Sequence, residues 1–287
     1  MMKIASIDIG TNAVKSKIFK TTPTSIEFIE GIRSPIRLGT DVFTNGLLAK
    51  DKLDLLVKTL RKYQNNFIKN KIFMYEIVAT SAFRDTQNSE EARRYVENKI
   101  EHPIRIISGL EEAKLIRFHP KAQSRSSKVY VDVGGGSTEI YIYHNNKHII
   151  QSFQLGAVRG MLGKDDPEEW SRLKKWLRKQ PKTSTLVGLG GNIRSFLNLN
   201  NTKKMKSENF IKEITNLNSL DVGTKISAYK LQKDRADVID FALQIYIEII
   251  KILKVQEIKS TKWGVSDSIA VKTFHELYSK KISISRS

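Results

Sequence analysis

Two stretches decide the fold: residues 131–143, VDVGGGSTEIYIY, and residues 7–19, IDIGTNAVKSKIF. Each begins as a buried strand, turns at an aspartate followed by glycine, and returns as a second strand. Asp8 aligns with Asp132, so the two copies lie far apart in the chain. A solenoid repeats every ~20–50 residues. The wider spacing therefore indicates a duplicated domain.

The duplication predicts two domains, residues 1–124 and residues 125–287. The total of 287 residues suits this division, since domains commonly hold ~100–200 residues. A polar, turn-rich stretch at 119–128 is the candidate linker. The last helix, from Asp267, is a candidate to pack back on the first domain.

The chain is strongly basic, with 49 Lys and Arg against 30 Asp and Glu and a formal net charge of +19. A field of this sign attracts polyanions, but it also serves solubility, so charge alone names no partner. The absence of cysteine excludes disulfides and thiolate metal sites. No apolar run approaches the ~18 residues of a membrane span, and the first residues lack the apolar core of a signal peptide. We expect a cytoplasmic protein without a membrane partner.

The two strand–aspartate–glycine turns are the strongest candidates for chemistry. Backbone amides in a glycine-rich nest bind phosphate oxygens. A carboxylate does not bind phosphate directly, so Asp8 and Asp132 would bind a divalent cation that bridges to phosphate. A single aspartate at a strand end is more often only a turn residue, but two copies in register are a stronger signal.

Glu111 and Glu112 follow Ser108 at the predicted start of a helix. Glu111 lies three residues after Ser108 and is explained as a capping-box residue. Glu112 is not needed for capping, and it could hold a water molecule for attack on phosphorus.

Two further stretches follow predicted strands. Arg84 could clamp a phosphate, and the alternative is a surface ion pair with Asp85. Gly190 and Gly191 form either a phosphate loop or an ordinary helix-opening turn. The 5 histidines show no metal-ligand spacing, and none is assigned to a metal.

Several segments resemble the exopolyphosphatase/guanosine pentaphosphate phosphohydrolase (Ppx/GppA) family and occur in the family's order. They are IDIGTNAVK (7–15), SPIRLG (34–39), ATSAFRD (79–85), ISGLEEAKLI (107–116), VDVGGGSTE (131–139), LGAVRGM (155–161), GLGGN (188–192) and DRADVI (234–239). Each is weak alone, whereas together they are highly specific.

The resemblance implies an α/β fold of the actin-like ATPase superfamily, which includes acetate and sugar kinases, Hsp70 and actin. It consists of two ribonuclease-H-like domains with an interdomain cleft, in agreement with the duplication. The implied activity is that of an exopolyphosphatase, which uses a metal ion and water to remove the terminal phosphoryl group of inorganic polyphosphate. The alternative is removal of the 5′ γ-phosphate of guanosine pentaphosphate. Oxygen ligands favour Mg²⁺ or Mn²⁺ as the metal.

The resemblance also assigns roles to single residues. Glu112 matches the catalytic base, and Glu139 matches the acidic residue that positions metal and water. Asp8 and Asp132 match the metal-associated aspartates, and Arg84 matches a phosphate-contacting arginine. The phosphate-binding matches are Gly10, Thr11, Asn12, Gly134, Gly135, Gly136, Ser137, Thr138, Gly190 and Gly191.

The chain departs from the family pattern at two places. Asn192 stands where members commonly have threonine, and residues 264–270 match the family's C-terminal signature poorly. The chain resembles the short, two-domain members, which lack the additional helical domain.

Other functions compete with hydrolysis. A sugar or acetate kinase shares the fold, but the match at Glu112 favours water as the acceptor. A non-catalytic polyphosphate or alarmone sensor would not need the intact acids. No RNA- or DNA-binding pattern supports a specific nucleic-acid partner. A homodimer is left open. Basic residues spread over the chain favour a long polyphosphate over a nucleotide, and they include Lys174, Lys175, Arg178, Lys179, Lys182, Lys203, Lys204 and Lys206.

Overall fold

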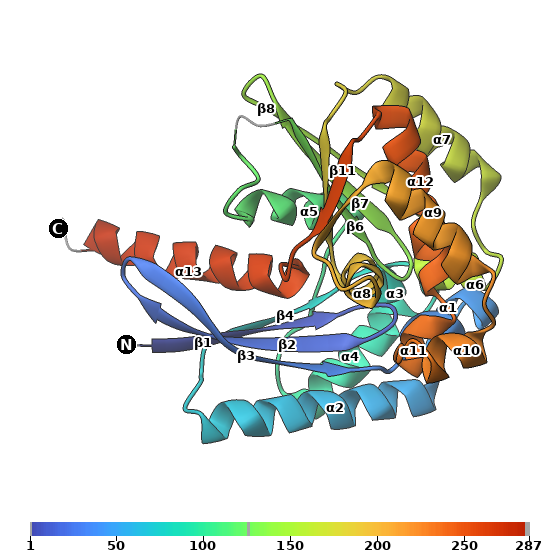
Figure 1. Cartoon of the computed structure of the whole chain (residues 1–287). Helices are drawn as coiled ribbons and strands as arrows, with labels where there is room; N and C mark the ends of the chain where they lie inside the picture. The colour runs from blue at the N-terminus through green and yellow to red at the C-terminus, as the bar shows by residue number, and fades with distance from the viewer. Residues whose placement is uncertain (1, 125–126, 285–287) are drawn as a thin grey trace. The chain divides into compact units, whose positions relative to one another are not determined.

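The computed structural model describes residues 2–124 and 127–284, and the chain divides into two compact units. Unit 1 holds the residues up to Ser108 together with those from Val265 onward, and unit 2 holds Gly109–Gly264. Each unit contains one mixed β-sheet covered by helices (Figure 1). The α/β class and the duplication inferred from the sequence are confirmed.

This division differs from the one drawn between residues 124 and 125. Helix α5 (Gly109–Leu115) packs on β7 (Thr138–His144) and β8 (Lys147–Phe153), which are strands of unit 2. The chain therefore enters unit 2 ahead of the expected linker. Residues 125 and 126 of that linker lie outside the described residues.

Unit 1 is built on a five-stranded sheet in the order β3-β2-β1-β4-β5. The first three strands are antiparallel neighbours, whereas β4 runs parallel to β1 and β5 runs parallel to β4. The elements are β1 (Met2–Ile9), β2 (Val14–Thr22), β3 (Ser25–Ser34), α1 (Leu38–Asn45), α2 (Lys50–Lys69), β4 (Tyr75–Ala79), α3 (Ser81–Arg84), α4 (Ser89–Ile100), β5 (Arg105–Ile106) and α13 (Val265–Ile284).

Helix α13 closes the core of unit 1 although it follows unit 2 in the chain. Its Ala270 and Phe274 pack with Ile4 and Phe19 of the first two strands. The Ser6 hydroxyl of β1 donates to the Ser266 carbonyl at 2.7 Å. In Figure 1 this helix lies on one side of the sheet, and α2 lies on the other.

Unit 2 is built on a six-stranded sheet in the order β10-β11-β9-β6-β7-β8. Read from β8 to β11, the antiparallel and parallel neighbours repeat those of unit 1. The elements after α5 are η1 (Ile116–Phe118), β6 (Lys128–Val133), β7, β8, α6 (Ala157–Met161), α7 (Pro167–Arg178), β9 (Thr185–Leu189), α8 (Gly191–Leu199), β10 (Lys204–Lys206), α9 (Ser207–Asn218), α10 (Val222–Ser227), α11 (Lys233–Ala236), α12 (Ile239–Leu253) and β11 (Glu257–Ser260).

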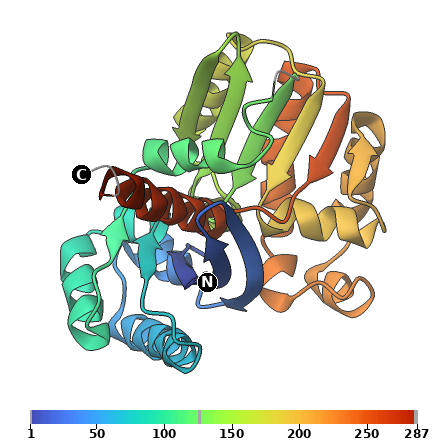
Figure 2. The ribbon, with the colours of Figure 1, turned by 90° about the vertical axis from the view of Figure 1, so that its left-hand side faces the viewer.

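Helices cover both faces of the second sheet. Figure 2 shows α5 lying across the green strands, with α12 behind the sheet. Helix α12 is apolar almost all round and buried, as its sequence predicts. Its Tyr246 hydroxyl donates to the Val131 carbonyl at 3.3 Å and lies 3.4 Å from the Leu189 carbonyl. This helix therefore supports the ends of β6 and β9, where the candidate site begins. Among the described residues no helix is both long enough and apolar enough to cross a bilayer.

Candidate active site

The turn between β6 and β7 is a glycine loop that is hydrogen-bonded to the start of α6. Its first amide, Gly134 N–H, donates to the Ser137 carbonyl at 2.9 Å. The Ala157 and Val158 amides donate to the carbonyls of Gly134 and Gly135 at 3.0 and 2.8 Å. These bonds fix the loop, since a change in its backbone would break several of them.

Gly156 explains why this loop and α6 approach so closely. A Cβ atom at Gly156 would lie 2.6 Å from the backbone of Gly135 and Gly136. Arg159, one turn further, donates from Nε to the Gly136 carbonyl at 3.0 Å. The LGAVRGM segment therefore acts as the rigid base of the glycine loop.

Three carboxylates gather beside this loop within unit 2. Asp132 and Glu139 are direct partners in the β6–β7 register, and partners in a ladder point to the same face of a sheet. Glu112 reaches them from α5, with 9% of its surface exposed. Burial, followed by the charges of Glu112 and Asp132, holds the pKa of Glu139 well above its usual value.

Two hydroxyls hold the buried Glu139 in place. The Ser152 hydroxyl of β8 donates to Glu139 Oε1 at 2.9 Å, and Ser137 of the glycine loop also hydrogen-bonds this carboxyl. Both bonds favour the ionised form, but burial and the neighbouring acids outweigh them. Burial and the two neighbouring carboxylates therefore dominate the pKa of Glu139.

The GLGGN turn after β9 lies against the same acids. Gly190 has φ +78°, and a Cβ atom there would lie 2.6 Å from Asp132 Oδ1. The position therefore requires glycine both for its left-handed backbone and for the close carboxylate. Gly191 opens α8, and a Cβ atom on it would collide with the guanidinium of Arg235 at 2.4 Å.

Arg235 lies in the DRADVI segment, and the sequence alone assigns it no role. Only 8% of its surface is exposed, and its Nη1 donates to Asn192 Oδ1 at 2.8 Å. Asn192 in turn donates to the Val133 carbonyl at 3.4 Å. Asn192, the departure from the family pattern, thus links a buried guanidinium to the end of β6. An arginine inside a motif is the one signal that could have pointed to it.

The corresponding turn of unit 1 has the same backbone but different charges. Asp8 is buried, and Lys15 Nζ lies 3.1 Å from its Oδ2. The Gly10 amide donates to the Ala13 carbonyl at 3.2 Å, and the Thr11 and Ser81 hydroxyls share a hydrogen bond of 3.0 Å.

The SPIRLG segment holds this first turn as LGAVRGM holds the second. The Arg37 amide donates to the Asn12 carbonyl at 3.0 Å, and the Gly39 amide donates to the Thr11 carbonyl at 2.9 Å. A Cβ atom at Gly39 would lie 2.1 Å from the Thr11 methyl group. Both units therefore fasten a strand–turn–strand loop with the start of a helix.

Arg84, the predicted phosphate contact of unit 1, is held by protein groups. Its Nη1 donates to the Ile107 carbonyl at 2.9 Å, and its Nε lies 3.5 Å from Asp85 Oδ1. The ion pair that the sequence offered as the alternative is thus present. A phosphate contact at Arg84 stays a prediction.

The structure distributes the predicted site residues over the two units. Unit 2 brings together Glu112, Asp132 and Glu139 with residues 134–138 and with Gly190 and Gly191. Asp8, Arg84 and residues 10–12 belong to unit 1. Glu112 was expected in the first domain, but it belongs to unit 2.

The acids of unit 2 fit a hard divalent cation by their chemistry. All donors are oxygens, and the raised pKa of Glu139 reflects negative charge that a cation would relieve. Among residues 2–124 and 127–284 no three His, Asp or Glu side chains form a group that could hold a metal ion. Metal binding by Asp132 and Glu139 therefore stays a prediction.

Comparison with known proteins agrees with this architecture. An exopolyphosphatase from Cytophaga hutchinsonii superposes with a TM-score of 0.86 at 18% identity, covering 96% of this chain and 98% of its own. A Ppx/GppA family member from Aquifex aeolicus gives 0.75 at 24% identity, covering 100% and 99%. These structures show the shared fold. The model of the Ppx/GppA phosphatase family matches residues 17–277 and confirms the resemblance seen in the motifs. With most of its length matched, this chain belongs to the Ppx/GppA phosphatase family.

Proposed function

We propose that this chain is a metal-dependent exopolyphosphatase, which hydrolyses the terminal phosphoanhydride of inorganic polyphosphate and releases orthophosphate. The observation that carries the proposal is the group of Glu112, Asp132 and Glu139 beside the glycine loop in unit 2. Acids beside a phosphate-binding loop are what hydrolysis of a phosphoanhydride requires, because the reaction needs a base for water and a cation for phosphate.

Glu112 is the general base of this proposal. It is the carboxylate contributed by a helix, whereas Glu139 is fastened between Ser137 and Ser152. Glu112 accepts a proton from water as the water oxygen bonds to the terminal phosphorus. The bridging P–O bond breaks, and the shortened polyphosphate leaves with the bridging oxygen.

The loop residues and the two fixed acids would orient the substrate. Backbone amides of the glycine loop beyond Gly134, whose own N–H is bonded to the Ser137 carbonyl, would surround the terminal phosphoryl oxygens, as glycine nests do. Asp132 and Glu139 would hold the cation, which would supply charge neutralisation for the phosphates. The buried guanidinium of Arg235 stands beside Gly191, the residue after the glycine that approaches Asp132, and brings positive charge to this turn.

We propose polyphosphate and not guanosine pentaphosphate as the substrate because of the charge distribution of the chain. The net charge of +19 is far more than a nucleotide pocket needs, and a long polyanion contacts many surface cations. The deciding experiment measures orthophosphate release from long-chain polyphosphate and from guanosine pentaphosphate side by side, with Mg²⁺ held constant. We expect a higher kcat/KM for polyphosphate. A higher value for the nucleotide would make the chain an alarmone phosphatase, and no release from either would make it a binding protein.

Salt dependence separates the two substrates further. A polyanion bound by several Lys and Arg releases counterions, so its affinity falls steeply with salt, by analogy with nucleic acids. We expect the KM for long polyphosphate to rise more steeply with salt than the KM for guanosine pentaphosphate. Equal slopes would show that the basic surface does not take part in binding.

A further inference from the structure

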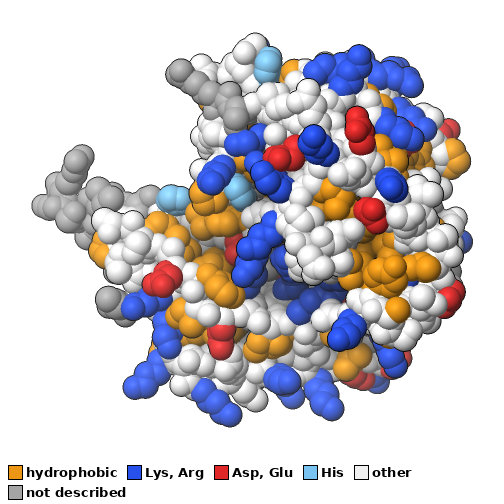
Figure 3. Space-filling view, viewed as in Figure 1, with side chains coloured by type: hydrophobic (Ala, Val, Ile, Leu, Met, Phe, Trp, Pro, Cys, Tyr) orange, Lys and Arg blue, Asp and Glu red, His pale blue; other side chains and the backbone are white. Residues whose placement is uncertain are grey.

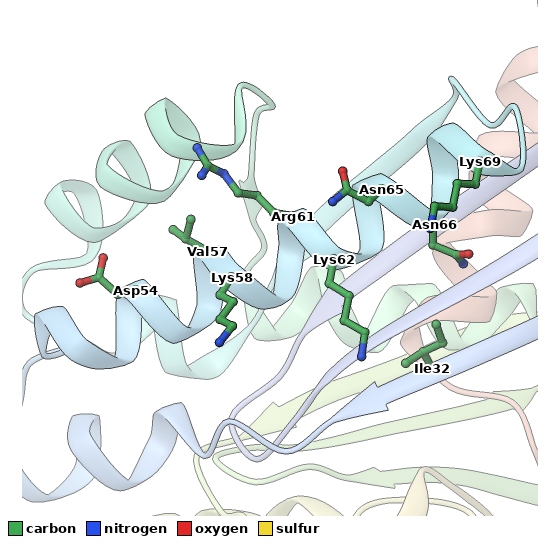
Figure 4. A pocket seen from close by; sticks show the side chains of 9 residues that line it. All are labelled: Ile32, Asp54, Val57, Lys58, Arg61, Lys62, Asn65, Asn66 and Lys69. Carbon is green, nitrogen blue, oxygen red and sulfur yellow. The ribbon is translucent and has the colours of Figure 1, made fainter.

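An open groove of about 660 Å³ lies on unit 1, away from its strand–turn–strand loop in sequence. It runs along helix α2 and is bordered on β3 by Ile32 (Figure 4). Four of its lining residues are basic and one is acidic: Lys58, Arg61, Lys62, Lys69 and Asp54. Val57, Asn65 and Asn66 complete the lining. In Figure 3 this helix contributes to the Lys and Arg side chains along the lower edge of the molecule.

Three of the lysines form a stripe on one face of α2. Lys58, Lys62 and Lys69 are spaced by four and then seven residues, which is the repeat of a helix face. A rise of ~1.5 Å per residue spreads them over about 16 Å. Figure 4 shows Lys58 and Lys62 extending in the same direction from the helix. All three are exposed, and within the described part of the chain none forms an ion pair.

Three of the remaining polar residues of the groove are engaged by the protein. Arg61 donates from Nε and Nη2 to the Lys99 carbonyl at 3.2 and 2.7 Å. Asp54 accepts from the Tyr95 hydroxyl, and Asn66 donates to Glu30 at 3.0 Å. The groove thus presents three exposed lysines beside residues that the protein itself holds.

These features select one class of ligand. Ammonium groups act as point charges and tolerate many anion geometries, unlike a planar guanidinium fork. Single-stranded nucleic acid is usually held by aromatic stacking as well as by charge, and the lining residues include no aromatic side chain. A flexible inorganic polyanion needs only positive charge for binding. It can also contact lysines that are spread over a length that one small ligand does not reach.

Two hydrogen bonds connect the start of α2 to the turn of unit 1. Lys52, in the first turns of α2, donates to the Ile36 carbonyl at 3.3 Å. The next residue after Ile36, Arg37, donates its amide to the Asn12 carbonyl.

We propose that the α2–β3 groove binds the body of an inorganic polyphosphate chain, away from the end that is hydrolysed. The inference rests on the proposed function for its substrate, but the binding it describes does not require turnover. It predicts that affinity depends on chain length, because a short polyphosphate does not span the ~16 Å over which the three lysines are spread.

The test compares two triple variants that remove the same charge. In the groove variant Lys58, Lys62 and Lys69 become Gln. In the control, the exposed Lys212, Lys230 and Lys251 of unit 2 become Gln. Each protein is measured for KM and kcat with long-chain polyphosphate and with tripolyphosphate, and for binding of labelled long-chain polyphosphate in EDTA.

We expect the groove variant to raise the long-chain KM by about tenfold at low salt, and to lower the salt slope of long-chain binding by about two units. Its kcat and its tripolyphosphate KM should match those of the control, because the reaction site is unchanged. Equal long-chain KM values and salt slopes in the two variants would overturn the proposal. Equal losses with tripolyphosphate would overturn it too, since the groove would then belong to the reaction site.

The binding measurement separates this inference from the proposed function. Groove-dependent binding without hydrolysis would refute the exopolyphosphatase activity and support polyphosphate binding in the groove. Hydrolysis of long chains without any effect of the groove variant would support the exopolyphosphatase activity and refute binding in the groove. If single-stranded RNA displaces the labelled polyphosphate at equal phosphate concentration, the occupant is nucleic acid and the assignment to polyphosphate is wrong.

Discussion

Lys15 lies 3.1 Å from Asp8, and the register partner at the same position of the second hairpin is Glu139, opposite Asp132. The two hairpins share a backbone, but one aspartate is neutralised by a lysine and the other faces a second acid. Duplication has thus left one neutral turn and one turn with an excess of negative charge. Metal binding at Asp8 or at Asp132 stays a prediction.

Replacing Glu112 by Gln tests the general base. Gln keeps the shape and hydrogen bonding of the side chain but cannot take a proton, so we expect kcat to fall by ~10²–10⁴-fold while substrate binding survives. The neighbouring Glu111→Gln is the matched control and should lose little. Phosphate release measures the first effect, and polyphosphate binding in EDTA measures the second. Equal losses of kcat in the two variants would contradict the assignment.

Replacing Glu139 by Gln should stabilise the metal-free protein at neutral and alkaline pH. The pKa of Glu139 is raised in the folded state by burial and by Glu112 and Asp132, so the folded chain holds a proton that the unfolded chain releases near 4.5. This group therefore supports folding fully below that pH, and its contribution declines as the pH rises toward the raised pKa.

Thermal unfolding in EDTA at several pH values measures this effect. The Tm of the wild type should fall more between acidic and alkaline pH than that of Glu139→Gln, and the variant should lose activity. A Glu139→Gln variant that is less stable than the wild type at high pH would contradict the prediction that the buried Glu139 carboxylate destabilises the fold there.

Metal removal should abolish the reaction reversibly. Asp132 and Glu139 offer only oxygen ligands, so activity should vanish with EDTA and return with Mg²⁺ or Mn²⁺. Asp132→Asn removes one charged ligand, and it should raise the Mg²⁺ concentration needed for half-maximal activity. A titration of activity against free Mg²⁺ reports both effects. Full activity in EDTA would exclude this metal role.

Gly190→Ala should damage both stability and activity, because two penalties act at this site. The left-handed backbone at φ +78° costs an alanine about 1 kcal/mol, and the new Cβ atom would press on Asp132 Oδ1 at 2.6 Å. Gly163→Ala is the control, since Gly163 has φ +64° and open space around it.

Urea unfolding of both variants compares the penalties. The additional loss in Gly190→Ala combines the displaced carboxylate with a backbone conformation, φ 78° and ψ −167°, that essentially only glycine adopts. Only Gly190→Ala should need more Mg²⁺ for activity, and this readout reports the contact with Asp132. Identical behaviour of the two variants would show that Asp132 can move aside freely.

The parts of this fold that depend on local sequence could be predicted. The paired motifs around Asp8 and Asp132 predicted two strand–turn–strand loops, and the structure confirms both. Asp166 before Pro167 is a local pattern that predicts a helix cap, and the Asp166 side chain accepts the Glu168 amide at 2.8 Å at the start of α7. Such features depend on residues within a few positions of each other.

Other features depend on contacts between distant segments and were not visible. Asn88 with Glu91 three residues later is a helix-start pattern, and α4 does begin after Asn88, but the Asn88 side chain hydrogen-bonds the backbone of Leu48 and does not cap the helix. The helix that carries Glu112 packs on β7 and β8, which moves the division between the units. Arg235 comes to Gly191 only through the fold. No local sequence pattern encodes these contacts, because each depends on which surfaces of distant segments the fold brings together.

The return of α13 to the first sheet has a consequence for biosynthesis. Ile4 and Phe19 leave the ribosome early, yet the residues that bury them, Ala270 and Phe274, are made only after all of unit 2. Unit 2 is continuous in the chain and can fold during translation, since domains generally fold as units while synthesis proceeds. Unit 1 must keep part of an apolar sheet face uncovered until the last helix emerges, and this interval is when the nascent chain is most exposed to aggregation.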